Sequence, residues 1–445
     1  MQRKTPANFK ESNMPHKVFS LQRLTSLFSR RQRGYSPLQK QKRVVVLPAL
    51  FMLLTPTFSH AADPGVYGDK IVLGGVLDLE GQSRGLGIGM REGIIAAFSG
   101  VTVQGKRLEY RAENDSYTPE LTQRQTQRLI NEGIFAMVGN VGTPTAKVAL
   151  PILADNNVPA IGFFTGAGLL RPGTGNIINY RASYVQETAA VIEQSFEAGI
   201  KPKEICAYVQ NDAYGMAGVA GIKVALQNRP QTREIVARLD ELLEKSGDNP
   251  NRNGIGPVGV YQRNTLSSRA GYDSLKQWES SQNTTCKLVV TVGTYSAIGR
   301  FAAYSRQKGN QWLISAVSFT GADNLQSTLE QFGVTQGVIL TQVVPAIDSD
   351  LAIVKAAQKA LKDRLNVVSL EGYIVGRMVV EMLQRIDGEI TREKFIAVAR
   401  GSNFTMGGLK LDFQRDNQAS DMVSVTYFKN KTYQNIDSTQ LSALF

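Results

Sequence analysis

Two short loops carry the residue types that suit an anion-binding site. The apolar stretch 136–138 runs into GNVGTPT, which contains Thr143, and the stretch 160–161 runs into GFFTGA, which contains Thr165 and Gly166. Each loop offers a small hydroxyl side chain and backbone N–H groups that can bind a carboxylate. Two such loops after successive strands favour one shared anion site. The alternative is that Thr143 and Thr165 only cap helices.

Other kinds of chemistry find little support. The only histidines, His16 and His60, lie in an N-terminal head that we expect to be removed. This excludes histidine triads, histidine general bases and histidine metal ligands from the remaining chain. The glycines at 85, 87 and 89 lack the G-x-G-x-x-G spacing of a dinucleotide loop, and no G-x-S-x-G motif is present. We therefore expect no enzyme, no cofactor and no metal.

The rest of the sequence alternates short apolar runs with helical stretches, which is typical of parallel sheets with crossover helices. We predict strands at 71–76, 107–113, 136–138, 160–161, 204–210, 258–261, 288–292, 312–315 and 338–343. We predict helices at 86–98, 119–132, 143–156, 187–197, 215–227, 267–280, 296–307, 348–363, 370–386 and 392–400, then two hairpin-like strands at 409–413 and 422–429. The helix-forming run 233–245 and the polar stretch 247–256 that follows it are together either an insertion on the second lobe or a long surface loop.

The positive charge of the chain, +12 at pH 7, is concentrated in its first 61 residues. They carry 11 of the 50 Lys and Arg residues and 1 of the 38 acidic residues, so the remainder is nearly neutral and no nucleic-acid partner is expected. A basic stretch, the apolar run 44–58 and small residues before Ala62 predict an export signal cleaved after Ala61. A membrane anchor is the alternative, but the run is shorter than the ~20 residues of a span. Residues 1–39 are either an overlong start of the signal or the product of a wrongly chosen start codon.

In their order and spacing, these pieces resemble the type I periplasmic binding proteins of ABC transporters, in the Leu/Ile/Val-binding branch. The matching pieces are IVLGGVLDLEG, ENDSYTPE, MVGNVGTPT, PAIGFFTGA, NYRASY, QNDAYG, VTVGTY, TQVVP, VSLEGY and MGGLKLDF. The resemblance implies an α/β fold of two doubly wound, Rossmann-like lobes joined by a three-segment hinge, with the ligand in the cleft. Residues 62–183 and 344–420 would form the first lobe, and residues 184–343 and 421–437 the second.

The resemblance also implies the residues of the site. Thr143 matches the family's carboxylate-binding hydroxyl, and Thr165 and Gly166 fall in its second carboxylate-binding loop. Tyr214 and Tyr295 match aromatic residues that close over the ligand. The predicted ligand-binding set is Leu86, Thr143, Phe164, Thr165, Gly166, Tyr184, Tyr214, Tyr295 and Glu371.

One departure from the family pattern concerns the ligand. The acidic residue that binds the ammonium group in amino-acid binders is expected near 317–318, where neither residue is acidic. The ligand then has no ammonium group and is an aromatic acid, an amide or another small carboxylate, or another acid takes this role, with the candidates Asp78, Glu80, Asp212 and Glu371.

The resemblance implies a monomeric periplasmic protein that captures an amino acid or a related carboxylate or amide and delivers it to an ABC permease and ATPase complex. The alternative function is a ligand-binding sensor that acts through a separate membrane signalling partner.

The two cysteines, Cys206 and Cys286, stand at the starts of the predicted strands 204–210 and 288–292. In the doubly wound order 2-1-3-4-5 these strands are neighbours, about 4.8 Å apart. A disulfide needs Cα atoms about 4.4–6.8 Å apart. The sequence therefore predicts a disulfide formed after export, and the alternative is two reduced thiols that are out of register or on opposite faces of the sheet.

Overall fold

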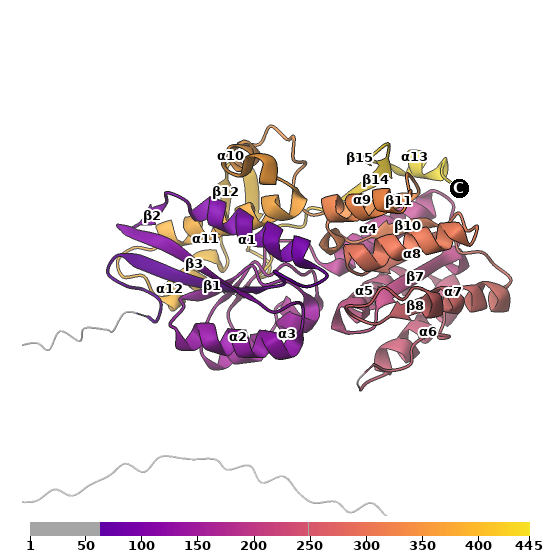
Figure 1. The fold of residues 1–445 in the computed structure, drawn as a ribbon, viewed down its shortest axis with the longest axis horizontal. Coiled ribbons are helices and arrows are strands. Elements are labelled where there is room, and N and C mark those ends of the chain that lie inside the picture. Colours follow the sequence, from indigo (N-terminus) through magenta and orange to yellow (C-terminus); the bar gives the residue numbers. More distant parts are fainter. Residues whose placement is uncertain (1–62, 248) are drawn as a thin grey trace, which may run out of the picture. The chain divides into compact units, whose positions relative to one another are not determined.

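The computed structural model of the protein describes residues 63–247 and 249–445 (Figure 1). The predicted basic extension, export signal and cleavage site lie outside these residues. None of the helices in this part of the chain is both long and apolar enough to cross a membrane. Two α/β lobes, each built on its own sheet, form the predicted fold class.

The first sheet has six strands in the order β2-β3-β1-β4-β5-β6. All neighbours are parallel except the short β2, which pairs antiparallel with β3. The side chains of the central strands are buried and apolar, as expected for parallel strands covered on both faces. The strands are β1 (Lys70–Leu77), β2 (Thr102–Val103), β3 (Lys106–Asn114), β4 (Ala136–Val138), β5 (Ala160–Ile161) and β6 (Ile177–Ile178).

The second sheet has seven strands in the order β15-β14-β11-β10-β9-β7-β8. Its five parallel strands follow the doubly wound order 2-1-3-4-5, and two antiparallel strands extend one edge. The strands are β7 (Ile205–Gln210), β8 (Val258–Tyr261), β9 (Leu288–Val292), β10 (Leu313–Ala316), β11 (Val338–Gln342), β14 (Ser424–Lys429) and β15 (Thr432–Asn435).

The predicted hairpin between 409–413 and 422–429 is wrong. β13 (Leu409–Asp412) pairs with β12 (Asn403–Met406), whereas β14 pairs with β11 and β15. The segment between β13 and β14 passes from one lobe to the other, beside the chain that leaves β6. There the backbone N–H of Ala419 donates to the carbonyl of Asn179, so these two crossings are hydrogen-bonded to each other.

Glycines allow α1 to pack closely against α11. A Cβ atom on Gly93 would lie 2.2 Å from the carbonyl oxygen of Ser369, and one on Gly372 would lie 2.5 Å from that of Met90. The glycine-rich run of α1 therefore serves helix packing. The helices are α1 (Arg84–Phe98), α2 (Pro119–Asn131), α3 (Thr143–Asp155), α4 (Tyr184–Glu197), α5 (Ala213–Leu226), α6 (Arg233–Glu244), α7 (Arg269–Gln282), α8 (Tyr295–Gln307), α9 (Ala322–Gln331), α10 (Ala352–Leu361), α11 (Val367–Gln384), α12 (Arg392–Ala399) and α13 (Ser438–Ser442).

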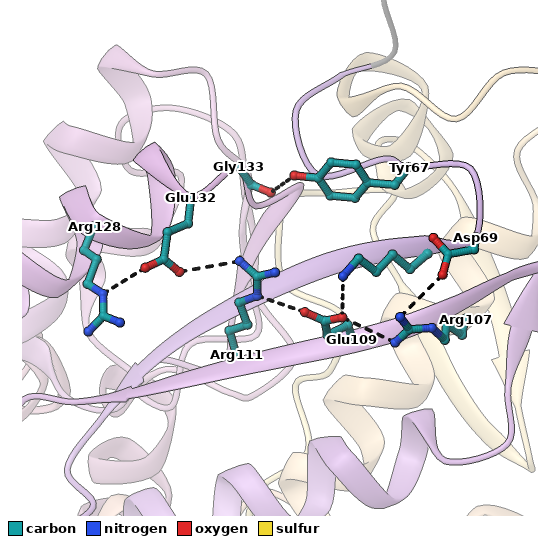
Figure 2. Close-up of polar contacts among 9 residues, drawn as sticks. Tyr67, Asp69, Arg107, Glu109, Arg111, Arg128, Glu132 and Gly133 are labelled. Atoms are coloured by element: carbon teal, nitrogen blue, oxygen red, sulfur yellow. Dashed lines mark hydrogen bonds and ion pairs between the residues drawn. The ribbon is translucent and has the colours of Figure 1, made fainter.

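β3 carries a row of ion pairs (Figure 2). The Glu109 carboxylate lies 2.9 Å from Lys70 Nζ and 2.9 Å from Arg111 Nε. Arg111 continues the row to Glu132, which pairs with Arg128. Because both signs of charge alternate along the row, this surface offers no basic patch.

Cys206 and Cys286 are joined by a disulfide, with their Cα atoms 5.7 Å apart. β7 and β9 are neighbours in the second sheet, and Cys206 aligns with Val289 in their ladder. Cys286 precedes β9, so the bond joins the start of β7 to the segment that leads into the neighbouring strand β9.

Candidate functional site

The two hydroxyl-bearing loops of the first lobe lie against each other. β4 and β5 are adjacent, so the loops that follow them leave the same edge of the sheet. The backbone N–H of Gly142 donates to the carbonyl of Phe164, and Thr143 Oγ1 lies 2.7 Å from Thr165 Oγ1. Both threonine side chains are buried. The helix that begins at Thr143 has no side-chain cap, so neither threonine serves as the cap of this helix.

Tyr184 extends this hydroxyl pair. The Thr165 hydroxyl lies 3.2 Å from the Tyr184 hydroxyl, and the Tyr184 backbone N–H donates to the carbonyl of Gly166. A Cβ atom on Gly166 would lie only 2.7 Å from the Tyr184 ring and 2.8 Å from its backbone nitrogen. Glycine is therefore required where the loop meets α4.

Aromatic rings from both lobes fill the region beside the hydroxyls. The Tyr184 and Tyr214 ring centroids are 5.3 Å apart, and the Tyr214 ring lies 4.6 Å from that of Phe319. Phe319, which follows β10 in the second lobe, also lies 5.3 Å from Phe164 in the first. Sequence reasoning missed Phe319, and its only signal was its position next to the expected acidic residue.

Leu86 and Tyr295 lie where the lobes touch. The backbone N–H of Gly85 donates to the Tyr295 hydroxyl at 3.4 Å, which joins the starts of α1 and α8. Leu86 is fully buried, and its side chain is next to Gly321 of the second lobe. The structure thus places both residues at the boundary between the lobes, and neither touches the threonine pair through a hydrogen bond.

A buried ionic cluster contacts the Phe164 ring. Arg181, between β6 and α4, ion-pairs with Glu371 of α11, with Nε 2.9 Å from Oε1 and Nη2 3.0 Å from Oε2. Nη2 also donates to Ser318 Oγ at 2.9 Å. The guanidinium carbon lies 4.2 Å from the Phe164 ring centroid, a cation–π contact. Glu371 is thus engaged by a residue that sequence reasoning did not single out.

Glu187 of α4 adds a second carboxylate to this cluster. Its oxygens accept hydrogen bonds from Ser318 N at 2.7 Å, Ser318 Oγ at 3.0 Å and Thr341 Oγ1 at 2.5 Å. Burial raises the pKa of both Glu187 and Glu371, and the Arg181 guanidinium opposes this shift. A carboxylate therefore lies beside residue 318, but it is supplied from another helix and already holds three hydrogen bonds.

The other acids proposed for an ammonium group are also engaged. Asp78 accepts from the backbone N–H groups of Gly81 and Ser83. Asp212 caps α5 through Tyr214 N and pairs with Arg263. Glu80 accepts from Asn114 Nδ2. Burial raises the pKa of Asp78 and of Asp212.

Comparison with known proteins agrees with this architecture. A family model described as periplasmic binding protein matches residues 70–236. A possible leucine/isoleucine/valine-binding protein from Rhodopirellula baltica SH 1 is 35% identical, with a TM-score of 0.73, and the match covers 86% of this chain and 99% of that chain. No curated protein sequence matches the chain.

Two more distant structures share the fold. One is an ABC-transporter solute-binding protein from R. palustris in complex with 4-hydroxybenzoate, with 15% identity, a TM-score of 0.64 and coverage of 83% of this chain and 96% of that chain. The other is a branched-chain amino acid ABC transporter protein from Thermus thermophilus with bound valine, with 14% identity, a TM-score of 0.67 and the same coverage. The identity to the Rhodopirellula protein over nearly its whole length shows that this chain belongs to the Leu/Ile/Val-binding-protein-like family of type I periplasmic binding proteins.

Proposed function

We propose that this chain is exported to the periplasm, captures a small carboxylate-bearing ligand between its lobes and delivers it to an ABC permease and ATPase complex. The observation that carries the proposal is the buried hydroxyl pair of Thr143 and Thr165 at the uncapped start of α3. Free N–H groups at a helix start and two hydroxyl donors suit a carboxylate. The ligand class is an amino acid or a related carboxylate or amide, since relatives bind valine and 4-hydroxybenzoate.

Binding is tested by thermal-shift screening of amino acids, amides and carboxylic acids on the chain that begins at Ala62. A ligand present at 100 times its Kd should stabilise the folded state by about 2.7 kcal/mol. If no compound of these classes shifts the melting temperature, the proposed ligand class is wrong.

The site is tested with Thr143→Val. Loss of a hydrogen bond to a charged group costs about 1.5–3 kcal/mol, so the affinity should fall roughly 10- to 100-fold. The matched control is Thr126→Val, because Thr126 is equally buried in the first lobe and its hydroxyl has no hydrogen-bond partner among the residues that the structure describes. Equal affinities of the two variants would place the carboxylate elsewhere.

Delivery is tested in cells. A strain that lacks the gene should lose uptake of the ligand found in the screen, the wild-type gene should restore it, and Thr143→Val should not. Undiminished uptake in the deletion strain would favour sensing over transport.

A further inference from the structure

Arg181 holds an unpaired donor inside the protein. Its side chain is 1% exposed, Nε and Nη2 face Glu371, and Nη2 also donates to Ser318. Within residues 63–247 and 249–445 neither Nε nor Nη1 makes a hydrogen bond, but Nε lies 2.9 Å from the Glu371 carboxylate, whereas Nη1 is not part of that ion pair. A buried charged donor without an acceptor is costly, so an acceptor from outside the chain is the physical explanation to test.

The same side chain borders a small cavity. Its volume is about 10 Å³, room for roughly one water-sized group, and it is lined from both lobes by Phe164, Arg181, Ser318, Glu371, residues 342–344 and residues 367–368. Phe164 directly precedes Thr165, so the cavity adjoins the loop that carries the hydroxyl pair. The Phe164 ring also contacts the Arg181 guanidinium, so this one residue joins the loop of the threonines to Arg181.

The charges around Arg181 restrict which group fits. Glu371 already balances the guanidinium, and Glu187 lies behind Ser318 with a second carboxylate. A ligand ammonium would meet the guanidinium, and a second ligand carboxylate would meet two glutamates. An amide or hydroxyl oxygen accepts the Nη1 hydrogen bond and adds no charge, which avoids the cost of burying an unpaired ion.

We propose that Arg181 Nη1 binds a neutral oxygen of the ligand, and that the ligand is a carboxylic acid with an amide or hydroxyl group and no amine. This inference rests on the proposed solute-binding function and specifies the ligand of the same site. The carboxylate lies at Thr143 and Thr165, and the neutral oxygen lies at Arg181.

The experiment is isothermal titration calorimetry of the chain from Ala62 with matched pairs of compounds. 4-Carbamoylbenzoate is compared with 4-isopropylbenzoate, and succinamate with 4-methylpentanoate, because each pair exchanges an amide for a hydrocarbon group with the same number of non-hydrogen atoms. 4-(Aminomethyl)benzoate tests the amine. In at least one pair the amide should bind roughly 10- to 100-fold more tightly than the hydrocarbon, and the amine should bind more weakly than either aromatic partner.

Two variants link this preference to Arg181. Arg181→Lys keeps a cation for Glu371 but lacks the forked donors, so the amide preference should be lost. The double variant Arg181→Met/Glu371→Leu removes both partners of the pair, which is often tolerated where removal of one is not, and it should lose the preference too. The control is Arg392→Lys, because Arg392 is also buried but donates to backbone carbonyls of the first lobe, among them those of Ile134 and Phe135. It should keep the preference.

The outcomes separate the two proposals. If amide and hydrocarbon partners bind equally well to the wild-type chain, the role of Arg181 is overturned while solute binding stands. If the preference survives in both Arg181 variants, the donor is elsewhere. If an amine-bearing acid binds most tightly, the ligand class is overturned, and if no compound binds, both proposals fall.

Discussion

Gly166 offers a sharp test of how the carboxylate loop is built. The substitution Gly166→Ala would place a Cβ atom 2.7 Å from Tyr184 Cδ1 and 2.8 Å from the Tyr184 backbone nitrogen. Carbon atoms in contact prefer about 3.5–4.0 Å. A ring can rotate away, but the backbone nitrogen can move only by weakening its hydrogen bond to the Gly166 carbonyl, which is 2.8 Å long.

The expected loss of stability follows from these two contacts. Overpacking of a buried position costs about 1–3 kcal/mol, and the weakened hydrogen bond adds about 1 kcal/mol. We therefore expect Gly166→Ala to lower the free energy of unfolding by about 2–4 kcal/mol. Since Tyr184 also contacts the Thr165 hydroxyl, the affinity for any ligand of the threonine pair should fall as well.

Urea unfolding followed by circular dichroism measures this loss as a shift of the transition midpoint. The matched control is Gly168→Ala in the same loop, because a Cβ atom there would have no neighbour within 4 Å. The control should be neutral, or more stable by up to about 1 kcal/mol. Equal midpoints for the two variants would refute the claim that the loop requires glycine at 166.

Three further predictions concern buried or paired groups. Burial raises the pKa of Asp115 to about 6, above its ordinary 3.8, so ionisation of this carboxyl destabilises the folded state as the pH rises from about 4 to 6. The free energy of unfolding of Asp115→Asn should therefore rise relative to that of the wild type by up to about 3 kcal/mol between pH 4 and pH 7. A difference in urea midpoints that does not change with pH would contradict this. The hydrogen bond from Lys70, with support from Arg111, lowers the pKa of Glu109, so the stabilisation from its ionised form is present above about pH 4.5 and is lost as the pH falls below the lowered pKa. Glu109→Gln should therefore cost less than about 1 kcal/mol at pH 7 and less than that at pH 3, and an equal cost at both pH values would speak against this. Denatured, unreduced protein should contain no free thiols, and removal of the Cys206–Cys286 bond, which spans a sequence separation of 80 residues, should cost up to about 4 kcal/mol; two titratable thiols per chain would rule the bond out.

The sequence predicted the two sheets because their central strands are short apolar runs separated by helical stretches. β2 and β6 have two residues each and were not predicted, whereas the equally short β5 was recognised because a glycine-containing loop follows it. The C-terminal strands were recognised but paired wrongly. β13 and β14 are consecutive in sequence, which favours a hairpin, yet their partners are set by the crossing of the chain between the lobes, which no local pattern reveals.

Part of the site could be predicted from the sequence, because the loops that follow neighbouring strands of a sheet lie side by side. Thr143 and Thr165 follow adjacent strands, so their contact could be anticipated. Arg181 and Glu371 are 190 residues apart in sequence, and their pairing depends on how α11 packs beside the first crossing. Sequence reasoning therefore found the acid without its partner and treated Glu371 as free to bind a ligand.

Two buried glutamates, Glu187 and Glu371, lie near residues 317–318, where the family pattern has an acidic residue and this chain has none. Ser318 occupies that position and donates two hydrogen bonds to Glu187, so the missing charge is replaced from α4. A ligand ammonium at Glu187 would have to share the carboxylate with Ser318 and Thr341, and at Glu371 it would have to share it with the Arg181 guanidinium, a like charge. Breaking a buried ion pair by removing one partner is strongly destabilising. The arrangement therefore favours a ligand that brings no amine to this end of the cleft, and it leaves Arg181 as the donor that such a ligand meets.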